Sequence, residues 1–131
     1  MTASSGLDDS IRRAWATNAL ATELLVERIP EEIWSAAVPG YPRKTVRVVA
    51  AHIHNARSRW IKTLGVPHGI ARPPLVDPRR VSRAGLVRAL KGSRRGMSAL
   101  LDLALERGGS IPPTKAYVWR NLPLDAGHVL S

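Results

Sequence analysis

The sequence has 131 residues, 20 of them Lys or Arg against 10 Asp or Glu, which gives a formal net charge of +10, and it holds no Cys. This length fits one domain spanning residues 1–131, and an apolar content of 44% is that of a globular protein. The lack of cysteine excludes disulfides, thiolate nucleophiles and Cys-ligated metals. No apolar run approaches the ~20 residues that span a bilayer, and the first residues lack the pattern of a signal peptide. We therefore expect a cytoplasmic protein with no membrane partner.

Four segments have the apolar spacing of amphipathic helices, and none alternates like a strand. They cover about residues 9–28, 45–64 and 82–107, and a last one starts near residue 121. Pro30 and Gly65 follow the first two, and Gly108 with Gly109 ends the third. Residues 38–42 read as an ordered loop, and the Pro-rich stretch 66–80 reads as a long loop that could carry function or mobility.

We expect the last helical segment to be cut short, because the sequence ends at Ser131 after only about nine residues of it. Three full helices and a stub predict an all-α fold, an up-and-down antiparallel four-helix bundle with a truncated fourth helix. We expect such a bundle to leave an apolar groove open, and an open groove favours a partner chain. The sequence therefore predicts a homodimer.

Histidine is the metal-ligand type that stands out, and two histidines, His52 and His54, lie two residues apart on the second predicted helix. Side chains two residues apart on a helix are separated by about 200°, so this pair cannot share one metal. One ring is expected to face the interior and the other the solvent. The apolar stripe is centred near Ile53, between the two rings, and helical spacing does not choose between them.

The run TVRVVAAHI from Thr45 to Ile53, followed by Arg59-Trp60, resembles the second helix of the DinB-like family, the damage-inducible-type four-helix bundles of bacteria. Three other stretches agree with that family in the same order along the chain. They are IPEEIW at 29–34, GYP at 40–42 and NLPLDAGHVLS at 121–131. The resemblance therefore covers nearly the whole chain as an ordered set of elements.

In that family three histidines bind a divalent metal, commonly zinc or nickel, and the resemblance implies His52 as the ligand on the second helix. The other two ligands lie on the fourth helix at positions beyond Ser131, and His128 matches an upstream histidine that we do not expect to bind. The resemblance also implies a metal-dependent hydrolase or a low-molecular-weight-thiol S-transferase, with a small molecule or thiol as substrate. It assigns no catalytic residue in this chain. We expect the 131-residue form to bind metal weakly or not at all and to be inactive.

A basic run that begins just before the third predicted helix and continues along it leaves a different function open. Its members are Arg79, Arg80, Arg83, Arg88, Lys91, Arg94 and Arg95, with no acid between Asp77 and Asp102. Such a run is usually a solvated helix face. The alternative is a non-catalytic module that binds nucleic acid or another anionic partner, with an affinity that falls as salt rises. A bundle that acts only as an interaction partner is a third reading.

Overall fold

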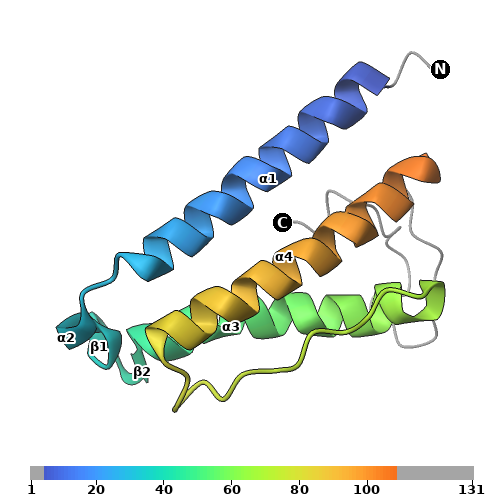
Figure 1. Ribbon diagram of the computed structural model, residues 1–131. Helices are drawn as coiled ribbons and strands as arrows, with labels where there is room; N and C mark the ends of the chain where they lie inside the picture. The colour runs from blue at the N-terminus through green and yellow to red at the C-terminus, as the bar shows by residue number, and fades with distance from the viewer. Residues whose placement is uncertain (1–4, 109–131) are drawn as a thin grey trace.

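The computed structural model describes residues 5–108, which are mostly helical, so the predicted all-α class is confirmed for them (Figure 1). The elements are α1 (Ser5–Glu27), α2 (Glu31–Trp34), β1 (Ala37–Val38), β2 (Tyr41–Thr45), α3 (Val46–Trp60), the π-helical η1 (Ile61–Gly65), the 3-10 helix η2 (Val66–His68) and α4 (Arg83–Glu106). The small antiparallel sheet of β1 and β2 replaces the loop predicted at 38–42. The predicted fourth helix, with His128, lies outside the described residues.

The two long inner helices begin at side chains that cap them. Thr45 accepts a hydrogen bond from the backbone N–H of Val48 at the start of α3, and Ser82 accepts one from Gly85 at the start of α4. Such caps satisfy backbone donors that have no partner within the helix. Gly108, with φ of +72°, follows α4 in the left-handed conformation that glycine adopts without strain. These local signals explain why the helix positions were predictable.

Residues 69–82, which we call the return segment, run back along α3 toward its first turn (Figure 1). Four side chains of α3 hold the backbone of this segment. Ser58 donates to the carbonyl of Pro73, His54 lies 2.7 Å from that of Pro74, Asn55 bonds both the N–H and the carbonyl of Val76, and Arg47 donates to that of Arg79. The return segment passes Ser58, near the end of α3, and reaches Arg47, near its start, six residues later. The two pieces therefore run in opposite directions.

Because the chain returns to the beginning of α3 before α4 starts, α3 and α4 are parallel, and α1 runs opposite to both (Figure 1). The packing agrees, since Ala50 shares a cluster with Leu86 and Leu90 near the two helix starts. Near the other end, Ile61 shares a cluster with Leu100. The predicted up-and-down order is therefore wrong at this connection. The physical reason is the length of the return segment. Its 14 residues span up to ~46 Å when extended, about twice the ~22 Å length of α3, so the segment can return to the start of α3.

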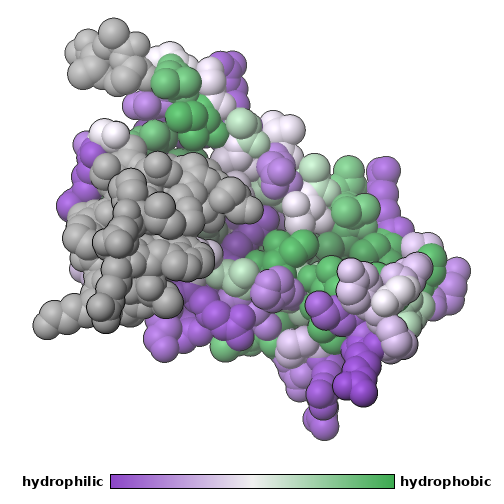
Figure 2. Space-filling view, turned by 180° about the vertical axis from the view of Figure 1, so that it is seen from behind, coloured by the Kyte–Doolittle hydropathy of each residue, from purple (hydrophilic) through white to green (hydrophobic). Residues whose placement is uncertain are grey.

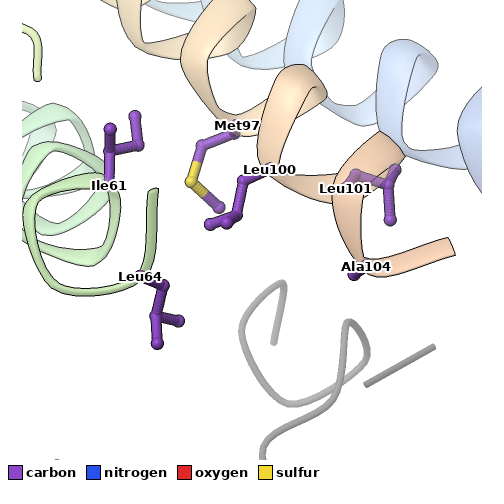
Figure 3. Packing of buried hydrophobic residues seen from close by; sticks show 6 residues of the cluster. All are labelled: Ile61, Leu64, Met97, Leu100, Leu101 and Ala104. Carbon is purple, nitrogen blue, oxygen red and sulfur yellow. The ribbon is translucent and has the colours of Figure 1, made fainter. Parts of the chain in front are cut away.

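Helix α4 lies at the centre of the described fold and packs against both α1 and α3. Its buried apolar stripe is Leu86, Val87, Leu90, Met97, Leu100, Leu101 and Ala104. The last four of these meet Ile61 and Leu64 of η1 in one cluster (Figure 3). Two tryptophans add polar anchors, since Trp15 donates to Ser98 of α4 and the buried Trp34 donates to the carbonyl of Val81. No helix of the described part is long and apolar enough to cross a membrane.

Replacing Asn55 with Ala removes both hydrogen bonds to Val76 and is expected to lower the free energy of unfolding by about 2 kcal/mol, since each such bond contributes roughly 1 kcal/mol. Urea denaturation measures this change. The matched control is Arg59→Ala, an exposed position of the same helix, which should change stability by less than ~0.5 kcal/mol. Equal effects of the two substitutions would show that the return segment is not held by Asn55.

Candidate functional site

His54 is the interior member of the histidine pair. Its side chain is 1% exposed, and its Nε2 lies 2.7 Å from the carbonyl oxygen of Pro74. A carbonyl only accepts hydrogen bonds, so Nε2 is the donor in this bond. The other ring nitrogen, Nδ1, is buried without a hydrogen-bond partner among the described residues. His54 therefore helps to hold the return segment against α3.

His52 lies on the other side of α3 and is exposed. It makes no hydrogen bond or ion pair with another residue of the 5–108 range. The expectation that one ring faces inward and the other outward is therefore confirmed, and the structure identifies which is which. Of the two rings, His52 has its nitrogens free for an added ligand.

Within residues 5–108, no three side chains of the His, Asp and Glu types come together to hold a metal ion. His52 alone cannot form a closed tetrahedral site, which takes four ligands, or a catalytic one, which takes three from the protein. The two further ligands were predicted at positions beyond Ser131. The assignment of His52 as a metal ligand thus remains a prediction.

A charged cluster lies where α1, α3 and α4 meet, and we call it the arginine cluster: the buried Glu23 and Arg57 with the half-buried Arg94. Glu23 of α1 is 5% exposed, and its carboxylate Oε2 lies 2.9 Å from Nε of Arg94 on α4. Arg57 of α3 is 8% exposed, and its guanidinium carbon lies 5.0 Å from the ring centroid of Trp15. The cluster joins three helices through one ion pair and one cation–π contact.

The arginine cluster holds two cations and one anion, so it carries an excess charge of +1. Removal from water lowers the pKa of Arg57, the positive charge of Arg94 lowers it further, and the negative charge of Glu23 opposes both. Nη1 of Arg57 is buried without a hydrogen-bond partner, as is Oε1 of Glu23. A buried charge with no partner of its own costs several kcal/mol. Arg57 has no ion pair of its own among the described residues, although the charge of Glu23, which pairs with Arg94, also attracts it.

The sequence analysis missed this cluster because it interpreted the basic run with Arg94 as a solvated face and assigned no role to Glu23 or Arg57. A signal was present for Glu23, which lies four residues after Ala19 and three before Val26, both buried. Such spacing puts the carboxylate on the apolar face of α1. Arg57 likewise lies four residues before the buried Ile61. A charged residue inside an apolar stripe is therefore the sign that identifies the cluster.

Five members of the basic run lie on α4 and divide into two groups, whereas Arg79 and Arg80 precede this helix. Arg94 points inward to Glu23, and Arg83 donates to the carbonyl of Ile29 and lies 3.5 Å from Glu31. The other group is exposed and has no ion pair within the described residues: Arg88, Lys91 and Arg95. We call this group the α4 basic stripe, because positions three and seven residues after Arg88 share its side of the helix.

Comparison with known proteins adds no assignment, because no family model, no curated protein and no solved structure matches this chain.

Proposed function

We propose that the protein is a DinB-like four-helix bundle that binds zinc or nickel through His52 and acts as a metal-dependent hydrolase or low-molecular-weight-thiol S-transferase. Its support is the motif resemblance together with one observation of the structure, the different surroundings of the two histidines. His54 is hydrogen-bonded to the carbonyl of Pro74, whereas His52 is exposed and has no hydrogen-bond partner among the described residues. The predicted homodimer, the cytoplasmic location and the small-molecule or thiol substrate belong to the same proposal.

The metal, when bound with an open coordination position, lowers the pKa of a coordinated water or thiol and so supplies a nucleophile near neutral pH. The role that we propose for the described residues is to place one imidazole ligand, that of His52. Its position on a regular helix, held by the return segment through His54 and Asn55, fixes its backbone. The described residues give one ligand, so no reaction step is assigned to them.

Nickel titration followed by NMR tests this proposal at single residues. Paramagnetic Ni²⁺ is expected to broaden the amide signals around His52 first, because His52 offers the free imidazole on α3. Affinity should be low, since one imidazole holds a divalent ion weakly. His52→Ala should remove the broadening at α3.

His68→Ala provides the matched histidine control, because this residue lies in η2 and outside α3. It should leave the broadening at α3 unchanged. Broadening that persists around residue 52 in His52→Ala, or that never occurs there in the unmodified chain, would contradict the assignment of His52.

A second candidate function is favoured by the α4 basic stripe. Arg88, Lys91 and Arg95 are exposed on one side of a regular helix, and none of them has an acidic partner among the described residues. We infer from this that the stripe could bind phosphate groups of a nucleic acid without catalysis. The protein's excess of 10 positive charges adds a non-specific attraction to the same partner.

Replacing Arg88, Lys91 and Arg95 with Glu is expected to abolish DNA or RNA retention in a filter-binding assay over a range of salt concentrations. If the unmodified protein makes three phosphate contacts to duplex DNA, the logarithm of its association constant should fall as the logarithm of the salt concentration rises. The expected slope is about −2.7.

The matched control replaces three exposed cations outside α4 with Glu, namely Arg13, Arg28 and Arg43. This variant lowers the net charge by the same amount. Equal losses in the two triple variants would mean that net charge alone is responsible. No binding by the unmodified protein would remove this candidate.

A further inference from the structure

Helix α1 packs against α4 with one side and leaves a largely apolar row exposed on another. The members of this row alternate at intervals of four and three residues, which is the heptad spacing of a coiled-coil contact. We call the row the α1 seam: Leu7, Ile11, Ala14, Asn18, Ala21 and Leu25. Leu7 is 65% and Leu25 is 69% exposed, Ile11 is half-buried, and the other three are exposed. The seam is therefore an accessible helix face about 27 Å long.

The spacing of the seam indicates the kind of element that fits it. On the face that Figure 2 shows, hydrophobic residues are exposed in patches with hydrophilic residues around them. Contiguous apolar surface of this kind marks a contact site. A repeat of 3.5 residues keeps one stripe facing a neighbour only when that neighbour is also a helix. The partner of the seam is therefore expected to present an apolar helix.

Charge favours a second copy of this chain as that partner. The protein carries a formal net charge of +10, so two copies repel each other wherever their cations meet. Residues 14–26 of α1 include one charged residue, Glu23, and its carboxylate is buried beside Arg94. The exposed surface of this stretch therefore carries no charge. Two copies can meet there without repulsion, whereas an acidic partner would find no cation there.

Asn18 gives the seam a group that pairs with itself. Its side chain is exposed and makes no hydrogen bond with another residue of the 5–108 range. An amide has both donors and an acceptor, so two Asn18 side chains can bond each other when the helices are parallel and in register. In heptad notation Asn18 occupies an a position, where one Asn fixes the register of a parallel pair. An antiparallel pair that sets Leu7 against Leu25 would place Asn18 against Ala14 and bury its amide unpaired.

We propose that the protein forms a dimer through the α1 seam, with the two α1 helices parallel and Asn18 of one copy against Asn18 of the other. This inference names the contact surface of the homodimer proposed above and rests on that part of the proposed function. It does not depend on the metal ligand, because His52 lies on α3.

Analytical ultracentrifugation of the whole protein over a range of concentrations tests the surface. The unmodified protein should be a dimer at high concentration and dissociate on dilution. Leu25→Glu sets two like charges against each other and should be monomeric where the unmodified protein is dimeric. Leu20→Glu is the matched control, since Leu20 is 52% exposed and lies about 140° away around α1, and it should remain dimeric. Asn18→Leu should strengthen the dimer, because an Asn in a seam lowers its stability.

Disulfide formation tests the direction of the two helices, and the chain has no native cysteine to interfere. Ala21→Cys should form a covalent dimer on mild oxidation, because this position faces its own copy in a parallel pair. Ala16→Cys is the matched control, since Ala16 is exposed on another side of α1 and should not crosslink.

The outcomes separate the surface from the rest of the proposed function. A monomeric unmodified protein would overturn both this proposal and the predicted homodimer, and another occupant would then cover the seam. A dimer that survives Leu25→Glu, or that Leu20→Glu dissociates equally, would keep the homodimer and reject the seam. Absence of a crosslink in Ala21→Cys would reject the parallel arrangement. His52→Ala should remain dimeric, so a failure of nickel binding leaves these results unchanged.

Discussion

The hydrogen bonds between α3 and the return segment are the constraint on which the rest of the described fold depends. They lead the chain back to the first turn of α3, so that α4 must start there and run parallel to α3. This direction places the buried apolar residues of α4 against both α1 and α3, and it brings Arg94 within reach of Glu23. The buried histidine belongs to the same set of bonds, which leaves His52 as the exposed ring of the pair. One local attachment thus determines the helix order and the surroundings of the candidate site residues.

The positions of the helices were predictable from the sequence, and their directions were not. Apolar spacing, the caps at Thr45 and Ser82, and the glycines after the helices are local features, and they placed the three long helices to within a few residues. Direction depends instead on bonds between residues about twenty positions apart, such as Asn55 with Val76. A Pro-rich stretch of this length fits a tight reversal or a long return equally well, and periodicity alone does not distinguish them.

The candidate site shows the same division. Spacing on the helix left His52 and His54 equivalent about Ile53, and the carbonyl of Pro74 separates them. The basic run was predicted as a solvated helix face, which is correct for Arg88 and wrong for Arg94, whose side chain pairs with the buried Glu23. Buried charges escape such reasoning because composition does not show which cation finds a carboxylate. The resemblance to DinB-like proteins points to His52, whereas the arginine cluster follows from the packing of three helices.

The parallel arrangement of α3 and α4 is tested most directly by distances between spin labels, and the lack of native cysteine makes specific labelling simple. One pair of introduced cysteines replaces Val49 and Arg88, and the other replaces Val49 and Arg107, which lies ~28 Å further along α4. Double electron–electron resonance should give the shorter distance for Val49 with Arg88. A shorter distance for Val49 with Arg107 would mean that the helices are antiparallel, and it would contradict the role given to the return segment.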